Sequence, residues 1–448
     1  MPWTRDSVEE FLEQHAIHTV RVGWCDLHGL MRGKALSRER FLEALERGVA
    51  QSTAPLLMDL RGDVDDRASR AGKAGWPDMW AIPALDSLRH LPHDPGAAEL
   101  VADLVDEDGQ PVQASPRYVL RRVMQRALEL GWHFTIGAEL EFYIFRDEEC
   151  ATLPPGRQAL RVHLGRDERR CIERLWRDLA AMGFLTEALY AEDGPGQFEI
   201  NLAADEPLAT CDMAFIFRRT VKQIVAREGL VATFMAKPLA DASGSGFHLH
   251  QTASIGDSGD AASKARKPAF TLDGDRASKA CCQFAAGQLA FAVEAAALYL
   301  PTVNAYKRIK LRGSCPLSLC WAWDNRSCAL RLIRDRGGEV RLENRIPGAD
   351  ANPYLITAAA IATGLAGVEQ QLTPPEPATE STYLGRQGGE ALPCSLAEAV
   401  AALDQSSLLR DWLGDDFVDA FVAMKSHEAD RFASSITDWE RAEYLPYL

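Results

Sequence analysis

The sequence predicts an α+β protein with two domains that meet near residue 113. Three observations support this fold class. The first 35 residues contain two strand-like runs on either side of a tight turn at 26–29, which is typical of a strand–turn–strand unit. Ser115-Pro116 is a helix-start signal and stands shortly before a long strand-like run. Helical and strand-like segments alternate after it, and 448 residues are enough for two hydrophobic cores.

Each element of the predicted N-terminal domain, residues 1–112, has a local signal. A short helix over 7–15 is capped by Asp6 or Ser7. The other predicted elements are strands over 18–25, 31–35, 80–83 and 100–105, a helix over 38–47 that ends at Gly48, and a charged surface loop over 61–75.

The predicted C-terminal domain, residues 113–448, contains most of the helices. The long apolar segment 280–300 is interrupted by Gln283, Gln288 and Glu294, so it predicts one buried alanine-rich helix and not a membrane span. The remaining predictions are helices over 116–130, 167–182 and 212–228, an exposed hairpin or loop over 253–280, and amphipathic helix for most of the chain from 392.

Composition and charge exclude several classes of function. The net charge of −15 argues against a nucleic-acid surface or an anionic membrane as the partner. The N-terminus has no apolar signal region. Ten cysteines are scattered without a Cys-x-x-Cys pair, which fits free thiols in a reducing cytoplasm and neither a zinc site nor a disulfide framework.

The strand-like run 136–145 has two carboxylates where an ordinary core strand would have none. Glu139 and Glu141 are two residues apart, so their side chains leave a strand on the same face. Two buried carboxylates repel each other unless a cation lies between them. The pair predicts a site for a hard cation such as Mg²⁺ or Mn²⁺, and the alternative is an edge strand with a solvated acidic face.

Two further segments place possible metal ligands beside tight turns. Glu192 and Glu199 flank Gly194-Pro195-Gly196, a turn that can bring both carboxylates to one ion, whereas a solvated turn would suit Glu192 alone. His248 and His250 follow a Gly-Ser-Gly turn and share one face of the next strand. A single histidine there would more often be a core residue, but a pair favours a ligand role.

A basic region complements the acidic one. It comprises the segment 304–308, the pair Asn325-Arg326, and Arg331. In the segment 341–345, Arg341, Glu343 and Arg345 alternate with other residues and therefore project on one face. Arginine suits carboxylate and phosphate oxygens, so arginines beside carboxylates predict a site that binds a metal ion and an anionic substrate, and the alternative is a solvated cationic strand.

Taken in order, these segments resemble the glutamine synthetase family over nearly the whole chain. The matching runs are Gly-Ala-Glu-Leu-Glu-Phe at 137–142, Gly-Pro-Gly-Gln-Phe-Glu at 194–199, Gly-Ser-Gly-Phe-His-Leu-His at 244–250, Asn-Ala-Tyr-Lys-Arg at 304–308, Asn-Arg-Ser at 325–327 and Glu-Asn-Arg-Ile-Pro-Gly-Ala-Asp-Ala-Asn-Pro-Tyr-Leu at 343–355. The resemblance implies an N-terminal β-grasp-like domain followed by a catalytic domain of curved antiparallel sheet with helices. It also implies a homo-oligomer of six-membered rings, usually stacked as a dodecamer.

The resemblance also implies a role for individual residues. Two or more Mg²⁺ or Mn²⁺ ions are expected per site, one on Glu141, Glu192 and Glu199 and another on Glu139, His248 and Glu343. ATP is expected near Glu187, His250, Gln251, Thr252, Arg326, Arg331 and Arg341, and glutamate near Gly244, Arg308 and Arg345. Asp26 is expected to reach a neighbouring subunit's site and help to deprotonate the nitrogen nucleophile, and Arg326 and Glu343 are expected to take part in catalysis.

The implied activity is ATP-dependent ligation of glutamate to an amine. The γ-carboxylate would be activated as γ-glutamyl phosphate, with metals and arginines neutralising the transferred phosphate. An amine would then attack and release phosphate.

Three departures from the family pattern bear on the substrate. Where ammonia-using members have a flap glutamate, this chain has Ser314 or Cys315, which favours an amine larger than ammonia. Ser243 replaces an asparagine before the Gly-Ser-Gly turn, and Gly338 replaces a lysine near ATP. These features resemble the branch of glutamate–amine ligases, which includes γ-glutamylpolyamine synthetases.

The amine class is predicted from the segment around Ser314. The uncharged segment 314–323, with Leu317, Leu319, Trp321 and Trp323, favours a monoamine with an apolar tail. A polyamine would need carboxylates at the mouth, which an acidic loop with Asp63, Asp65 and Asp66 could supply. The alternatives are a glutamine synthetase that uses ammonia and a non-catalytic relative, for which loss of metal ligands is the expected mark.

Overall fold

The computed structural model describes residues 3–64, 70–153, 159–161, 165–256, 266–311, 315–316, 318–384 and 390–448. The first helix, α1 (Arg5–Gln14), begins earlier than predicted because Thr4 is its N-cap. The Thr4 hydroxyl accepts a hydrogen bond from the Ser7 amide, and the Ser7 hydroxyl accepts one from the Thr4 amide. Asp6 and Ser7 therefore lie inside the helix, and the predicted cap was wrong.

The N-terminal sheet has the strand order β2-β1-β6-β4-β3. The predicted strand–turn–strand unit is confirmed as β1 (Thr19–Cys25) and β2 (Met31–Ser37), which pair antiparallel. Helices α1 and α2 pack on this sheet over a core that includes Val8, Leu12 and Phe41. The other elements are α2 (Arg38–Arg47), β3 (Val49–Ser52), α3 (Ala54–Leu57), α4 (Arg70–Lys73), β4 (Asp78–Pro83), η1 (Leu85–Ser87), β5 (Arg89–His90) and β6 (Ala97–Val105). Asp65 and Asp66 of the predicted acidic loop lie outside the described residues.

The second sheet is larger and has β7 (Trp132–Phe145) near its middle, in the order β15-β16-β17-β11-β7-β9-β8. All of these strands pair antiparallel except β15 with β16. The predicted helix before β7 is confirmed as α5 (Pro116–Glu129). The other strands are β8 (Thr186–Ala191), β9 (Gln197–Asp205), β10 (Val231–Thr233), β11 (Phe247–Ile255), β12 (Lys267–Pro268), β15 (Trp321–Trp323), β16 (Leu330–Arg334) and β17 (Val340–Asn344), with β13 (Leu272–Asp273) and β14 (Arg276–Ala277) as a separate hairpin.

Two helix predictions needed correction. Helix α7 (Pro207–Arg227) begins five residues before the predicted start, because the Glu206 carboxylate caps the amides of Leu208 and Ala209. The predicted single helix over 280–300 is two helices, α8 (Lys279–Ala290) and α9 (Ala292–Tyr299), bent by 73°. The break is at Phe291, which leaves helical geometry at φ −105°, ψ 14°.

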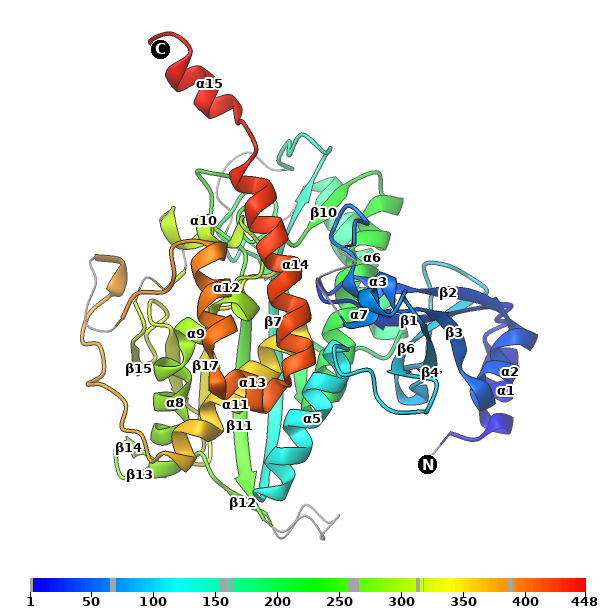
Figure 1. Cartoon of the computed structure of the whole chain (residues 1–448), viewed down its shortest axis with the longest axis horizontal. Helices are drawn as coiled ribbons and strands as arrows, with labels where there is room; N and C mark the ends of the chain where they lie inside the picture. The colour runs from blue at the N-terminus through cyan, green and yellow to red at the C-terminus, as the bar shows by residue number, and fades with distance from the viewer. Residues whose placement is uncertain are drawn as a thin grey trace.

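Helices cover one face of the large sheet. Helix α7 packs on β7 and β9, α6 (Arg166–Ala181) packs on α7, and α11 (Pro353–Glu369) packs against α5, α7, α8 and α9. The remaining helical elements are α10 (Ala305–Lys310), η3 (Thr382–Leu384), α12 (Leu396–Gln405), α13 (Ser407–Leu413), α14 (Asp415–Ala433) and α15 (Asp438–Tyr444). Figure 1 shows the small sheet on one side of the large one and α15 projecting away from the body. The structure is thus α+β, as predicted.

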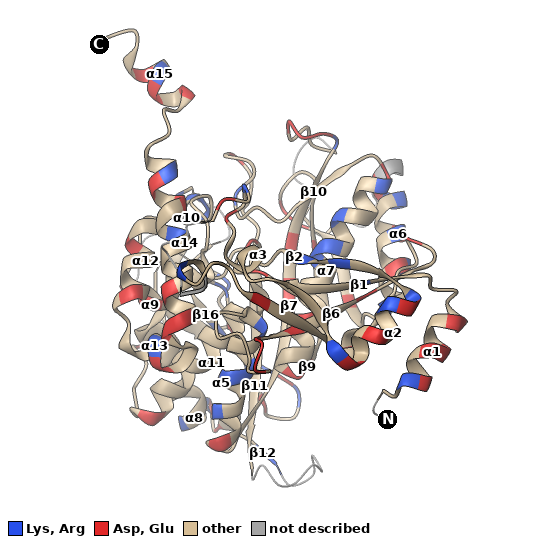
Figure 2. Cartoon of the chain, turned by 45° about the vertical axis from the view of Figure 1, so that its right-hand side comes forward, with Lys and Arg blue, Asp and Glu red and all other residues tan. Residues whose placement is uncertain are grey.

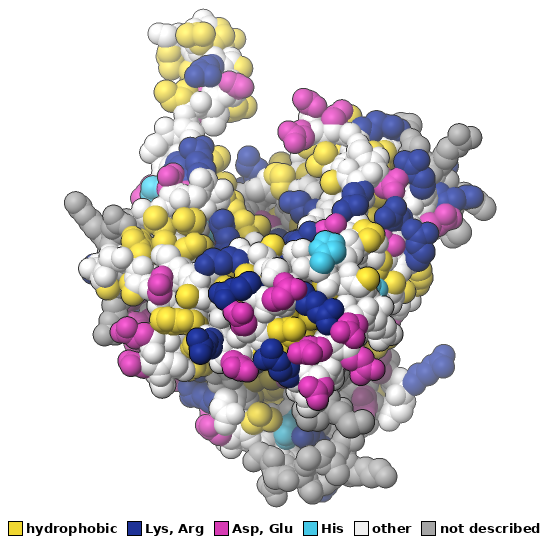
Figure 3. All heavy atoms as spheres, turned by 90° about the vertical axis from the view of Figure 1, so that its right-hand side faces the viewer, with side chains coloured by type: hydrophobic (Ala, Val, Ile, Leu, Met, Phe, Trp, Pro, Cys, Tyr) yellow, Lys and Arg dark blue, Asp and Glu magenta, His cyan; other side chains and the backbone are white. Residues whose placement is uncertain are grey.

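Charged residues occur both in the middle of the molecule and on its surface. Acidic positions lie on the strands in the middle of the molecule (Figure 2). On the face formed by the N-terminal sheet, basic and acidic side chains are interspersed, with no large area of one sign (Figure 3). Among the described residues, no single helix is both long and apolar enough to cross a membrane; only the bent pair α8–α9 has the necessary length and composition when its two helices are taken together.

Candidate active site

Strand β7 separates the hydrophobic core from a charged face. Its even-numbered residues, such as Ala138, Leu140 and Phe142, are buried in the main core. Glu139 and Glu141 therefore project from the opposite face, because side chains alternate along a strand. This confirms that the two carboxylates share a face, and β7 is an interior strand, so the alternative of a solvated edge strand was wrong.

The register of the sheet brings the other predicted ligands to the same face. His248 of β11 pairs with Glu139, and Glu199 of β9 pairs with Glu141. On the other side of β11, His250 pairs with Glu343 of β17. Directly paired residues in a sheet project on the same side, so segments far apart in the sequence form one row of charged side chains.

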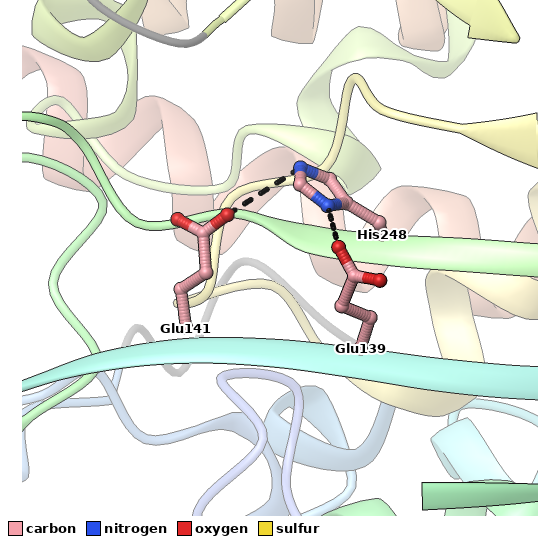
Figure 4. Close-up of side chains that lie close together, drawn as sticks. All are labelled: Glu139, Glu141 and His248. Carbon is pink, nitrogen blue, oxygen red and sulfur yellow. Dashed lines mark hydrogen bonds and ion pairs between the residues drawn. The ribbon is translucent and has the colours of Figure 1, made fainter. Parts of the chain in front are cut away.

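The distances define two groups of possible metal ligands. Nδ1 of His248 lies 2.5 Å from Oε1 of Glu139, and Nε2 of His248 lies 3.7 Å from Oε1 of Glu141 (Figure 4). Within the described residues, the donor atoms of Glu139, Glu141 and His248 all lie within 4.8 Å of one another, and so do those of Glu139, His250 and Glu343. The predicted groups were Glu141 with Glu192 and Glu199, and Glu139 with His248 and Glu343. Each observed group therefore differs in membership from the predicted one, and Glu192 and Glu199 belong to neither.

The chemistry of these groups fits a divalent cation. Nε2 of His248 is buried and has no hydrogen-bond partner, although it points at a carboxylate. Burial, with Glu141 and Glu139 nearby, raises the pKa of Glu192 to about 7. Burial, with Glu139 and Glu141 nearby, raises the pKa of Glu199 to about 10. A cation among these groups would offset the repulsion between the carboxylates and so lower the pKa values of Glu192 and Glu199. It would also accept the lone pair of Nε2 of His248.

Glu139 is held as an anion in spite of its burial. Burial opposes its charge, but hydrogen bonds from His248 and His250 keep the pKa of Glu139 well below its ordinary range. Burial likewise opposes the charge of Glu343, while Arg345 and the two histidines lower its pKa. Both carboxylates are therefore ready to bind a cation at neutral pH.

Arginines surround the second group. Nη1 of Arg331 donates to Oε2 of Glu343 at 3.0 Å, and Arg345 donates to the other oxygen of the same carboxylate. Nη1 of Arg341 donates to Nδ1 of His250 at 3.3 Å. The arginines and carboxylates therefore form one connected network, as the alternation in the sequence predicted.

Gly244 and Arg308 are in contact, and their predicted role in binding glutamate stays a prediction. A Cβ on Gly244 would lie 2.7 Å from Cγ of Arg308 and 2.8 Å from the carbonyl oxygen of Ala236, so only glycine fits there. Arg308 is buried, and its Nη1 donates to the Ile346 carbonyl at 2.8 Å.

The predicted nucleotide residues have different environments. The side chain of Gln251 lies on the core side of β11 and pairs with Gln288, whose Nε2 donates to its oxygen at 2.8 Å. Only the backbone of Gln251 is available to a nucleotide. Glu187 and Arg326 are exposed, while Thr252 shares the face of His250. The roles of these residues stay predictions.

Asp26 is buried within its own chain. Its carboxylate is fully buried and accepts hydrogen bonds from the amides of His28 and Leu30 and from Nε of Arg32 at 2.8 Å. Its carbonyl accepts one from the Asn352 side chain. In this chain Asp26 therefore stabilises its own turn and fixes that turn to the start of α11. Its role at a neighbouring subunit's site stays a prediction.

The segment that predicted the amine is described only in part. Ser314 and Leu317 lie outside the described residues. Leu319 and Trp321 are buried in the main core, and the Trp321 indole donates to the Pro375 carbonyl. These two side chains serve packing and do not offer an apolar surface to a substrate.

Three polar residues of the site were missed in the sequence. Nδ2 of Asn201 donates to Glu139 at 3.0 Å and to Glu199 at 3.1 Å. Tyr190 donates to Glu199, and Nε2 of Gln197 donates to Glu141 at 3.2 Å. The spacing of Gln197, Glu199 and Asn201 on one face of a strand was the available signal.

Comparison with known proteins identifies the family. Residues 113–444 match the glutamine synthetase catalytic domain. The chain is 33% identical to a glutamate–isopropylamine ligase from Pseudomonas sp., over 98% of both chains. It is 36% identical to the gamma-glutamylethanolamide synthetase GlnA4 of Streptomyces coelicolor, over 95% of this chain and 92% of that protein. A solved structure of GmaS without ligand is 29% identical and superposes with a TM-score of 0.85, covering 99% of this chain and all of that one. The chain therefore belongs to the glutamine synthetase family, in its branch of glutamate–amine ligases.

Proposed function

We propose that this protein is an ATP-dependent ligase that joins the γ-carboxylate of glutamate to a primary amine through a γ-glutamyl phosphate intermediate. The observation that carries the proposal is the single charged face on which Glu139, Glu141 and His248 meet the arginines of β16 and β17. One relative is named as a ligase of glutamate and isopropylamine, and another as a synthetase of gamma-glutamylethanolamide. Both names support an amine as the nucleophile.

The residues of this face are assigned to three tasks: binding metal ions, binding phosphate and binding glutamate. In the proposal, Mg²⁺ or Mn²⁺ ions neutralise the charge of the transferred phosphate. Their proposed ligands are the members of the two donor groups, Glu139, Glu141, His248, His250 and Glu343. Glu192 and Glu199 are proposed as further ligands from the family resemblance. We assign Arg331 and Arg341 to the phosphate oxygens and Arg345 and Arg308 to the carboxylates of glutamate, because guanidinium groups suit both kinds of oxygen. The contacts of Arg331, Arg341 and Arg345 with Glu343 and His250 support the assignment. These positively charged groups are fixed before substrate arrives, so little reorganisation is needed during transfer.

The proposed nucleophile is a primary amine and not ammonia. The chain has neutral Ser314 and Cys315 where ammonia-using members have a glutamate, and Cys315 is buried. A carboxylate at that place would bind ammonium, and its absence leaves room for an alkyl group. Because Leu319 and Trp321 are core residues, the apolar tail predicted for the amine no longer rests on them.

An amine panel tests this function. Release of ADP would be measured with glutamate, ATP and Mg²⁺ in the presence of ammonia, methylamine, isopropylamine, ethanolamine, putrescine or spermidine. We expect ADP release to need both metal and amine, and kcat/KM for at least one amine to exceed that for ammonia by about tenfold or more, which is about 1.4 kcal/mol of transition-state discrimination.

The variant Ser314→Glu restores a carboxylate and should shift the preference toward ammonia, whereas Ser314→Gln should not. A preference of the unmodified protein for ammonia would show it to be a glutamine synthetase. Metal-independent or absent ADP release with every amine would contradict the ligase assignment.

The assembly and the domain division are also proposed. We infer a homo-oligomer of hexameric rings, stacked as a dodecamer, from membership of the family. Residues 1–112 and 113–448 are proposed as the two domains, in keeping with the two sheets and the two large cores. Light scattering of the purified protein tests the assembly, and a monomer would contradict it.

A further inference from the structure

A cavity outside the candidate active site lies between the N-terminal turn and α7. Its volume is about 790 Å³, which is within the range of small-molecule sites. The wall is built by the turn 28–32, by α7, by β10 and the residues after it, by the loop 302–304, and by Glu428 of α14. None of the predicted metal ligands lines it.

Two cations on α7 face this cavity without an ion pair to a carboxylate, and the nearby charge of Asp350 acts on one of them, Arg218. Arg218 and Lys222 are four residues apart and therefore lie on the same side of the helix. Nη1 of Arg218 donates to the Ala351 carbonyl at 2.8 Å, and its guanidinium lies 5.5 Å from the centre of the Phe234 ring. Within the described part of the chain, Lys222 makes no hydrogen bond or ion pair.

Apart from Asp350, the other charged groups of the wall are already compensated. Arg219 pairs with Glu99 and Arg32 pairs with Asp26. Glu428 accepts from Nζ of Lys425 at 2.8 Å. The cations available to a ligand are therefore Arg218 and Lys222.

The inner wall has polar atoms that lack partners. Lys425 also donates to Nδ1 of His28 at 3.1 Å, while Nε2 of the same ring is buried and unpartnered. Asp350 accepts from the Thr302 hydroxyl on one oxygen, and its other oxygen is buried and unpartnered. Buried polar atoms without partners are costly, and here they mark a wall that a bound molecule or water can satisfy.

Beside polar residues such as Gln223 and Thr233, the lining has an apolar part. Leu30 and Met31 come from the N-terminal turn, Phe215 from α7, and Phe234 and Met235 from the end of β10. Such a wall favours a ligand with a hydrocarbon portion, because burying apolar surface on both sides removes it from water.

We propose that this cavity binds a small organic carboxylate with an apolar chain. The carboxylate lies at Arg218 and Lys222, two cations that share the single carboxylate of Asp350, and the chain lies against Phe215, Phe234 and Met235. A bare inorganic anion would satisfy the cations but would leave the aromatic wall in contact with water.

Binding here affects the glutamate side of the active site, a step that rests on the proposed function. The loop 302–304 leads directly into α10, which contains Arg308. The Asn304 side chain bonds to both the amide and the carbonyl of Lys237, and the neighbouring Ala236 carbonyl accepts from the Ser245 amide at 2.9 Å. A ligand that shifts this loop therefore also shifts Gly244 and Arg308, which makes the cavity a regulatory site.

Isothermal titration of the assembled, full-length protein with hexanoate tests the binding step. Glutamate is kept saturating, so that hexanoate cannot enter the glutamate site. Lys222→Glu reverses one of the two cations, and Ala226→Trp fills the cavity from α7. Lys279→Glu is the matched control, because Lys279 is an exposed lysine at the start of α8, outside the cavity. We expect the control to bind as the unmodified protein does, and both cavity variants to bind at least about tenfold more weakly, as for loss of one charged hydrogen bond.

The proposal is overturned if hexanoate does not bind the unmodified protein, if inorganic phosphate binds the cavity equally well, or if Lys222→Glu and Ala226→Trp leave binding unchanged. Binding needs no turnover, so the result of the titration is independent of the result of the amine panel.

Where ligase activity is present, bound hexanoate should change KM for glutamate in the unmodified protein and not in Ala226→Trp. Unchanged KM with confirmed binding would contradict the regulatory role alone.

Discussion

Asn201 illustrates how single residues orient the carboxylates of the site. It bridges Glu139 of β7 and Glu199 of β9, two carboxylates that would otherwise repel each other across the strand pair. Outer hydrogen-bond partners of metal ligands fix the direction of the ligand oxygen. Asn201 is therefore a positioning residue and not a proposed ligand.

We predict that Asn201→Ala weakens Mg²⁺ binding by about 10- to 100-fold, the usual effect of losing such a partner. Titration calorimetry with Mg²⁺ alone measures this directly. Gln370→Ala, which removes an exposed amide at the end of α11, is the control and should leave the affinity unchanged. Equal affinities for Asn201→Ala and the unmodified protein would remove Asn201 from the site.

The raised pKa values of Glu192 and Glu199 predict an unusual dependence of stability on pH. Both groups stay protonated in the folded protein above their ordinary value of 4.5, up to about 7 and about 10. The unfolded chain binds fewer protons over this range, so the free energy of unfolding of the metal-free protein falls as the pH rises. A divalent cation displaces these protons, and its stabilising effect therefore grows with pH.

Thermal melts at about pH 6 and about pH 8, with EDTA or with saturating Mg²⁺, check this prediction. We expect Mg²⁺ to raise Tm by several degrees more at the higher pH. A shift that is the same at both values would mean that these two carboxylates do not bind the ion.

At the scale of elements, glycines decide how closely the strands approach the site. A Cβ on Gly246 would lie 2.6 Å from Nε2 of His248 and 2.9 Å from a guanidinium nitrogen of Arg308. At Gly137, on the neighbouring strand, the nearest atom would be Cβ of His250 at 3.4 Å, an ordinary contact. The turn before β11 is therefore close-packed against the ligands, whereas β7 has room.

Gly246→Ala should lower metal-dependent ADP release by about 100-fold, since a displacement of about 1 Å at a catalytic group has an effect of this size. Gly137→Ala, the matched control, should keep most of the activity. Both variants are compared by circular dichroism to confirm that they fold. Similar activities in the two variants would show that the Gly246 contact does not position His248.

At the scale of the whole molecule, buried charges fix the N-terminal sheet to the helices of the second core. Arg117 of α5 donates from Nε and Nη2 to both oxygens of Asp212, each at 2.8 Å, and from Nη1 to Asp103 of β6. The Tyr354 hydroxyl donates to the same Asp212 carboxylate at 2.7 Å. This network joins four elements, and its loss would leave a buried carboxylate without a cation.

We expect Arg117→Ala to lower the free energy of unfolding by about 3–5 kcal/mol, the usual effect of breaking a buried ion pair from one side. Arg121→Ala removes an exposed partner of the same Asp103, 2.9 Å away, and should have an effect below about 1 kcal/mol. Chemical denaturation monitored by tryptophan fluorescence measures both. Equal effects would mean that burial of the Arg117 network adds nothing to stability.

The sequence by itself determined which residue types meet on which face. The two-residue spacing of Glu139 with Glu141 and of His248 with His250 places each pair on one side of its strand, and the order of the motifs identified the family. The same alternation assigns the Gln251 side chain to the core side of β11.

Only the tertiary structure decided which strands are neighbours and in what register. Pairing His248 with Glu139, Glu199 with Glu141 and His250 with Glu343 joins segments that are distant in the chain. Local propensity carries no information about such pairing, because it is set by hydrogen bonds and core packing across the whole sheet. The cavity beside α7 arises in the same way, from parts of the chain whose sequences give no sign of each other.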